Sequence, residues 1–225
     1  VAPNFVKGEE GRQGLIHGTK KFTDPEFIEA WEFLDAWKPY LPDGYEGISY
    51  ADMQNLFISQ QALIFPAGSW DVSVFNNMSD GSFEMGAFQV PVPEEGASRY
   101  VCNHPDMGLA LNDASEHRDE AIEFLKWTTT EEFAKLWNQE IPGFFTLSKH
   151  EVELEDPLAL EMFSWTEEAE STPRIAYQYL SRGEFNTDAE IIRMTGLMFA
   201  GEMTPQEVAE EMQKGLESSY TPIEE

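Results

Sequence analysis

Cysteine is nearly absent from this 225-residue sequence, in which Cys102 is the only one. One thiol excludes an internal disulfide and a zinc site built from several cysteines. It leaves the compartment open, because many exported proteins carry no disulfide. Histidine is also scarce, and no two of the four histidines form a His-x-x-x-His pair. The sequence therefore predicts no local metal site.

Basic residues are few, with 14 Lys and Arg against 42 Asp and Glu, for a formal net charge of −28. Such an acidic surface repels phosphate backbones, which argues against nucleic acid as a partner. No apolar run approaches the roughly 18 residues that a membrane-spanning helix needs. The sequence starts Val-Ala-Pro-Asn, with neither an initiator methionine nor the pattern of a signal peptide, and is typical of the middle of a longer protein.

The usual signatures of catalysis and cofactor binding are missing as well. The chain has no Gly-x-Gly-x-x-Gly, no phosphate loop and no Gly-x-Ser-x-Gly turn, so nucleotide chemistry and an activated serine lack their usual supports. With 42 acids, close pairs of carboxylates arise by chance and carry little weight as a hydrolase signature. We therefore predict a protein that is not an enzyme, with no catalytic residue, metal or cofactor.

The sequence does contain enough apolar residues for a folded core, since 41% of its residues are hydrophobic and 13% are aromatic. This composition excludes a disordered acidic tail. Residues 1–22 are expected to form an irregular or edge segment, and 91–96, with two prolines and a glycine, to form a linker. Helical spacing and capping signals predict helices, and short apolar or alternating runs predict strands. The helices are expected at 23–34, 50–59, 71–78, 115–127, 130–137 and from 205 on, and the strands at 62–65, 83–90 and 107–111. Alternating helices and strands indicate the α/β class.

The most informative stretch is the one that ends at Trp70. Its apolar run, residues 62–65, predicts a buried strand, and Gly68 supplies the backbone freedom for a sharp turn. Ser69, Trp70 and Asp71 then follow at the strand end, where ligands gather in α/β sheets. Trp70 either faces a cleft there or fills the core between strand and helix.

Polar and aromatic side chains also stand at other breaks in the pattern. Aromatic faces stack on the apolar side of sugar rings, while Asp, Asn and His hydrogen-bond hydroxyls, so this mixture suits a neutral, hydroxyl-rich ligand. The alternatives are a local turn network, a core contact or a simple turn residue. The candidates are His104, Asp106, Phe144, Phe145 and Asn186.

Taken in order, several segments resemble the C-terminal portion of bacterial extracellular solute-binding proteins, in the carbohydrate-binding group that includes maltose-binding protein. Residues 57–70 are similar to the family's F-x-x-G-x-x-A-M-x-x-x-G-x-W segment, although Gln60 and Leu63 depart from it. Residues 83–91 resemble the strand that leads to the crossing between lobes. Residues 121–127 and 201–207 are similar to a helix and to the closing segment of the family.

This resemblance implies a type II periplasmic-binding-protein-like fold, mostly the C-terminal lobe plus the segment that returns to the N-terminal lobe. Residues 1–92 and 151–225 are expected in the C-terminal lobe, 93–98 in the crossing and 99–150 in the N-terminal lobe. The first half of such a protein would precede this sequence. Without it, the returned segment would expose apolar side chains such as Leu125 and Trp127.

The resemblance further implies an extracytoplasmic protein, in the periplasm or a lipoprotein held only by an N-terminal lipid anchor outside this sequence. Such a protein, expected to be a monomer, would bind an oligosaccharide between two lobes and deliver it to the membrane subunits of an ABC importer. Trp70 matches the tryptophan that stacks on a sugar ring in many members. Two alternatives remain: a carbohydrate-active hydrolase that uses Asp71 and Asp106, or a surface module that binds proteins through exposed aromatics.

Overall fold

A computed structural model describes residues 1–224 of the chain as two compact units. Unit 1 comprises Val1–Ile48, Gln89–His104 and the chain from Ala169 on, and unit 2 comprises Ser49–Phe88 and Pro105–Glu168. The helices of four or more residues and the strands are α1 (Ala2–Phe5), α2 (Glu9–Ile16), α3 (Pro25–Asp35), α4 (Tyr50–Ile58), α5 (Val72–Ser79), β1 (Tyr100–Cys102), α6 (Arg118–Trp127), α7 (Glu131–Glu140), α8 (Pro157–Glu168), β2 (Glu170–Thr172), η4 (Gln178–Ser181), α9 (Thr187–Phe199) and α10 (Pro205–Ser219). Three-residue 3₁₀ turns occur at Lys38–Tyr40, Tyr45–Gly47 and Ser69–Asp71. In the described part of the chain, no helix is long and apolar enough to cross a membrane.

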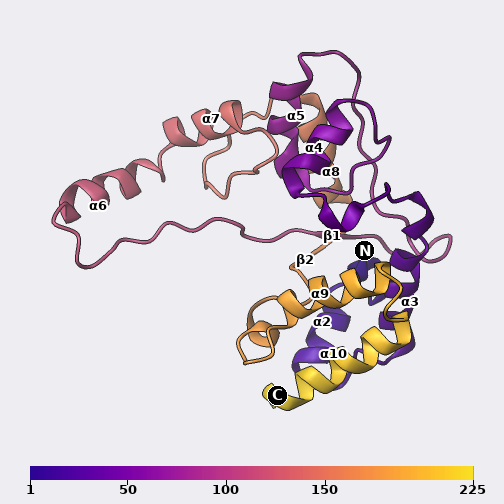
Figure 1. The fold of residues 1–225 in the computed structure, drawn as a ribbon. Coiled ribbons are helices and arrows are strands. Elements are labelled where there is room, and N and C mark those ends of the chain that lie inside the picture. The colour runs from indigo at the N-terminus through magenta and orange to yellow at the C-terminus, as the bar shows by residue number, and fades with distance from the viewer. Residues whose placement is uncertain (225) are drawn as a thin grey trace. The chain divides into compact units, whose positions relative to one another are not determined.

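Unit 1 is built around α3, α9 and α10, which pack against one another (Figure 1). Val208, Met212 and Leu216 recur every four residues along α10 and are buried, as their spacing predicted. Phe27 and Trp31 meet them from α3 in the same core. The segments that form this core come from both ends of the chain, so neither end folds the unit by itself.

The first turn of α10 carries a reciprocal cap. Thr204 Oγ1 accepts a hydrogen bond from the Glu207 backbone N–H at 3.2 Å, and Glu207 Oε2 accepts one from the Thr204 backbone N–H at 2.8 Å. These bonds satisfy backbone donors that the first helical turn leaves without partners. Hydrogen bonds from the Thr204 backbone and hydroxyl also lower the pKa of the Glu207 carboxyl.

Replacing Thr204 by alanine is therefore expected to lower the free energy of unfolding by about 1 kcal/mol. Glu207 is stabilising as a carboxylate above its ordinary pKa, and this contribution is lost as the pH falls through the lowered pKa. The difference between wild type and variant should thus be largest near neutral pH and shrink in acid. Urea unfolding at several pH values measures it, with Gln206→Ala as a surface control; a difference that does not change with pH would argue against the Glu207 contact.

The three predicted strands are wrong as secondary structure. Within residues 1–224 the strands are β1 and β2, which pair in parallel with Tyr100 opposite Glu170. Residues 62–65, 83–90 and 107–111 run without a ladder partner there. A strand is stabilised by hydrogen bonds to a neighbouring strand, and these segments have no such neighbour among the described residues. Leu63, predicted to be buried, is 93% exposed.

The N-terminal region is also different from its prediction. Residues expected to be irregular form α1 and α2, and Leu15 and Ile16 of α2 are buried in the core of unit 1. The prediction missed these helices because the segment is polar in composition. Packing against α3 and η4, rather than helix propensity, stabilises these short helices. The predicted helices elsewhere are confirmed to within a few residues by α3, α4, α5, α6, α7 and α10.

Unit 2 has an aromatic core between α4 and α5. Phe57 of α4 packs against the rings of Phe65, Phe75 and Phe83 at centroid distances of 6.0, 5.0 and 5.8 Å. In the same unit, α7 lies between α6 and the helices α4 and α5, and α6 lies farthest from them (Figure 1). Phe124 on α6 is exposed, whereas Leu125 and Trp127, which we expected to be exposed, are half-buried. Trp127 is covered in part by Phe133 at 4.9 Å.

The compact units divide the chain at other residues than the predicted lobes do. The first boundary falls after Ile48, and residues 49–88 are grouped with 105–168 rather than with the C-terminal helices. The contacts between α4 and α5 and the shared aromatic core hold 49–88 together as one piece. The assignment of these segments to lobes of a longer protein stays a prediction.

Candidate functional site

Trp70 lies in unit 2, in the 3₁₀ turn Ser69–Asp71 that leads into α5. The residue is half-buried. The ring folds back over Gly68: a Cβ at that position would stand 2.2 Å from Trp70 Cζ3. Gly68 has φ −123°, which any residue adopts. Its role is therefore to leave room for the indole and not, as predicted, to allow an unusual backbone turn.

The indole nitrogen is the first member of a hydrogen-bond network that includes three polar side chains. Trp70 Nε1 donates a hydrogen bond to Tyr50 Oη at 2.9 Å, and Tyr50 Oη donates one to Asp71 Oδ2 at 2.5 Å. Gln54 Nε2 donates to Asp71 Oδ1 at 2.7 Å. Asp71 is only 2% exposed, with both oxygens engaged. In this structure Asp71 is therefore buried and bonded to Tyr50 and Gln54, and a contact with a ligand stays a prediction.

The protonation of Tyr50 suits this arrangement. Although 46% of the residue surface is exposed, its hydroxyl lies among Trp70 and Asp71. Desolvation of the hydroxyl and the hydrogen bond to Asp71 raise the pKa of Tyr50 to about 12. Tyr50 therefore keeps its proton, and its bond to Asp71, at any physiological pH.

The loop around Gly143 meets the Trp70 turn. Gly143 has φ +97°, and a Cβ there would stand 1.9 Å from the Ser69 backbone oxygen. Only glycine combines that backbone conformation with so close an approach. Two of the predicted sites, the turn Ser69–Asp71 and the loop that carries Phe144 and Phe145, are thus neighbours in unit 2.

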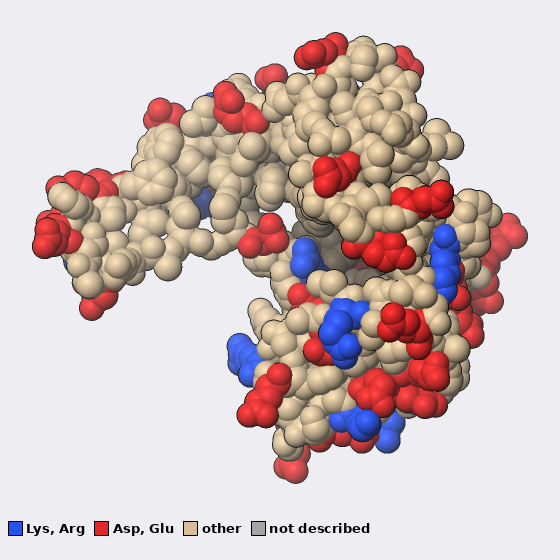
Figure 2. Space-filling model, viewed as in Figure 1, with Lys and Arg blue, Asp and Glu red and all other residues tan. Residues whose placement is uncertain are grey.

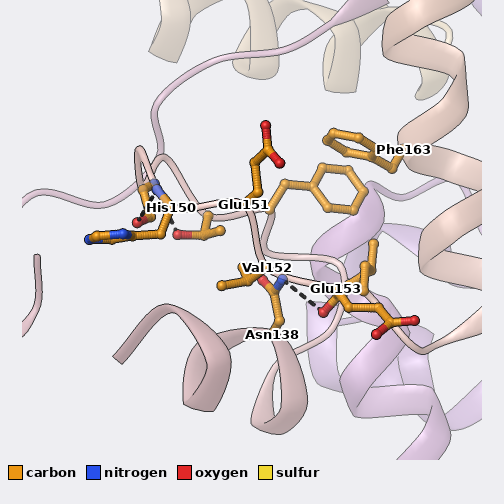
Figure 3. A pocket seen from close by; sticks show the side chains of 10 residues that line it. Asn138, His150, Glu151, Val152, Glu153 and Phe163 are labelled. Atoms are coloured by element: carbon orange, nitrogen blue, oxygen red, sulfur yellow. Dashed lines mark hydrogen bonds between the residues drawn. The ribbon is translucent and has the colours of Figure 1, made fainter. Parts of the chain in front are cut away.

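The two phenylalanines of this loop have different surroundings. Phe144 accepts a hydrogen bond at its backbone oxygen from Trp137 Nε1 at 2.7 Å, and its ring packs against the Trp137 ring. Phe145 packs edge-on against Phe163 of α8 at 5.0 Å and lines a cavity of about 490 Å³ (Figure 3). Both residues are half-buried, and of the pair Phe145 is the one that lines this cavity.

Asn138 of α7 forms part of the same cavity wall. It is 8% exposed; its Nδ2 donates to the Glu153 backbone oxygen at 3.4 Å, and its Oδ1 has no hydrogen-bond partner. The polar side chains on the rim do not face one another, since the His150 ring and the Glu151 carboxylate point in different directions (Figure 3). The cavity therefore offers a hydrogen-bond acceptor and aromatic surface, but no pair of facing carboxylates.

Charge distinguishes the surroundings of the site. Unit 2 contains 20 Asp and Glu against 4 Lys and Arg, and unit 1 contains 22 against 10. Most basic atoms visible in Figure 2 accordingly lie over the helices of unit 1. Among the described residues, no group of three or more His, Cys, Asp and Glu is placed to hold a metal ion. The net negative charge of unit 2 as a whole disfavours an anionic ligand.

Of the remaining predicted residues, Asp106 is exposed in unit 2, whereas His104 and Asn186 belong to unit 1. His104 belongs to unit 1, where its ring packs edge-on against Tyr177 at 5.2 Å. Asn186, also in unit 1, caps α9: its Oδ1 accepts from the Ala189 N–H at 3.0 Å. In this structure the Asn186 side chain therefore acts as a helix cap, close to the turn residue that was the alternative considered for it.

Sequence reasoning did not single out Tyr50, Gln54 or Asn138. Tyr50 and Gln54 are four residues apart on α4, so they share one helix face. That spacing was available, but nothing in the sequence says that this face meets Asp71. Asn138 carries no sequence signal, since one amide in a polar helix is ordinarily solvated.

Comparison with known proteins places the chain among binding proteins. Residues 2–135 match the family described as bacterial extracellular solute-binding protein. The "Multiple sugar-binding protein" of Streptococcus mutans is 33% identical over 86 residues, which are 38% of this chain and 20% of that protein.

Solved structures are similar over nearly the whole chain. A chitin oligosaccharide binding protein matches with a TM-score of 0.79 and 22% identity, over 97% of this chain and 55% of that one. A sugar transporter from Bacillus licheniformis in complex with stachyose matches with a TM-score of 0.67 and 15% identity, over 95% and 54%. A protein concerned with xylan utilization in Caldanaerobius polysaccharolyticus gives a TM-score of 0.72 at 18% identity, over 95% and 56%. The chain thus has the fold of these proteins and spans about half of their length.

Proposed function

The chain belongs to the bacterial extracellular solute-binding protein family, and on that premise we propose that it binds a carbohydrate oligosaccharide outside the cytoplasm for delivery to an ABC importer. The observation that carries the proposal is Trp70, a half-buried residue in the turn that leads into α5. Its indole nitrogen is hydrogen-bonded to Tyr50 of α4. An indole face held in this way suits the apolar side of a pyranose ring. The sugar-binding relatives support the same class of ligand.

The proposed mechanism is non-covalent capture. Trp70 stacks on one sugar ring, and the second lobe of the full-length protein closes over the ligand by a hinge motion. Phe145 and the cavity beside it would extend the contact to further rings. The importer recognises the closed form, and an N-terminal lipid anchor or a periplasmic location would keep the protein near it. The excess of acids in unit 2 favours neutral or amino sugars over uronic acids.

The two alternative functions have less support. A hydrolase would need two accessible carboxylates facing one glycosidic bond. Asp71, one of the two candidates, is buried and bonded to Tyr50 and Gln54. A module that binds other proteins through exposed aromatics predicts no response to sugars, which the following experiment measures.

A tryptophan-fluorescence titration of the full-length protein tests the proposal. The probes are N,N′-diacetylchitobiose, xylotetraose and stachyose, and the forms compared are wild type and Trp70→Ala. We expect a saturable change with at least one probe, a loss of affinity of at least about tenfold in the variant, and recovery of the sugar uncleaved. Trp37→Phe, a change in unit 1, is the control. Equal affinity in wild type and Trp70→Ala would remove Trp70 from the site, and cleaved sugar would favour the hydrolase.

A further inference from the structure

The hydroxyl of Tyr50 is the centre of a directed set of hydrogen bonds. It accepts from the only polar hydrogen of the Trp70 indole and gives its own proton to Asp71. Because a tyrosine hydroxyl has one hydrogen, donation to Asp71 leaves its lone pairs turned toward Trp70. Donation to a carboxylate also strengthens the hydroxyl as an acceptor, since such chains polarise one another.

Asp71, which accepts the hydrogen bond from Tyr50, is buried in the interior of unit 2. Asp71 stands at the junction of the Ser69–Asp71 turn and α5, and its second oxygen accepts from Gln54 of α4. The Tyr50 ring packs edge-on against Phe65 at 5.9 Å. A buried carboxylate without both donors would be costly, so Asp71 fixes the relative placement of α4 and the Trp70 turn.

These contacts leave the indole little freedom. Its nitrogen is bound to Tyr50 and its six-membered ring lies against Gly68. With the nitrogen already used, the indole can offer a ligand its ring surface but no hydrogen bond. Free rotation about the side-chain bonds would otherwise have to be lost on binding, at a cost in affinity.

We infer that Tyr50 is a positioning residue for ligand binding, which holds the Trp70 indole in its stacking orientation and is itself held by Asp71 and Gln54. This inference rests on the proposed function, because it assigns Tyr50 a role at the same site. Tyr50 need not touch the ligand. Its effect on affinity is exerted through the orientation of Trp70.

The test uses Tyr50→Phe in the full-length protein, with Tyr40→Phe, a change at a tyrosine that is 87% exposed, as the control. The first readout is the indole N–H signal of Trp70 in a ¹H–¹⁵N NMR spectrum, identified by its absence in Trp70→Ala. We expect Tyr50→Phe to shift this signal upfield and to speed its exchange with water, as happens when a hydrogen bond is lost. The second readout is the affinity for the three oligosaccharide probes, expected to fall roughly fivefold to tenfold.

Asp71→Asn is a second variant, in which one oxygen still accepts a hydrogen bond. It should keep an indole signal and an affinity intermediate between wild type and Tyr50→Phe. An unshifted indole signal in Tyr50→Phe would overturn the inference, and so would a shifted signal with unchanged affinity. If the wild-type protein binds none of the probes, the proposed function is wrong, and so is the role of Tyr50 in ligand binding. If Trp70→Ala binds as wild type does, the site fails even where the indole signal has moved.

Discussion

Replacing Gly143 by alanine is expected to lower the free energy of unfolding by about 2–5 kcal/mol. A positive φ of +97° is strained for a residue with a side chain, at about 1–2 kcal/mol. The new Cβ would also meet the Ser69 backbone oxygen at 1.9 Å, and forcing backbone segments apart costs about 1–3 kcal/mol more. Because Ser69 begins the turn that carries Trp70, oligosaccharide affinity should fall together with stability.

The matched control for this change is Gly81→Ala in the same unit. Gly81 has φ +69° but nothing within 4 Å of a Cβ, so it reports the backbone strain without the contact. Urea unfolding followed by circular dichroism compares the two, and sugar titration of the folded fraction reports on Trp70. An equal loss of stability in both variants would mean that the approach of the loop to Ser69 contributes nothing.

Raising the salt concentration is expected to stabilise the protein strongly. The chain carries a net charge of −28, and like charges at this density destabilise the compact state by self-repulsion. The ion pairs are mostly local and exposed, such as Lys135–Glu131 and Lys126–Glu123, and offset little of it. Salt at about 1 M shortens the screening length from about 10 Å to 3 Å. We expect the melting temperature to rise by roughly 10 °C between 0.1 and 2 M NaCl, corresponding to about 3–4 kcal/mol.

Charge variants separate screening from general salt effects on apolar surface. Replacing the exposed residues Glu116, Glu161 and Glu167 by lysine changes the net charge by six. The triple variant should melt higher than wild type in 0.1 M NaCl and gain less on addition of salt. The same slope in both proteins would show that salt acts through burial of apolar groups and not through charge.

Helices with an internal apolar stripe and a clear cap were predictable because both signals are local. The Val208, Met212 and Leu216 stripe and the Thr204 cap define α10 without reference to any other segment. The strand predictions failed because a strand depends on a partner that sequence does not specify. Residues 62–65 have strand composition, but no described segment pairs with them.

The sequence by itself determined the family, the acidic surface, most of the helices and the prominence of Trp70, since each of these depends on residue type or on spacing along the chain. Only the tertiary structure decided what surrounds Trp70. It placed Tyr50 and Gln54 against Asp71 and brought Gly143 onto Ser69. These contacts join residues 17 to 74 positions apart, and such distances are closed by packing of whole elements, for which no local pattern in the chain is a signal.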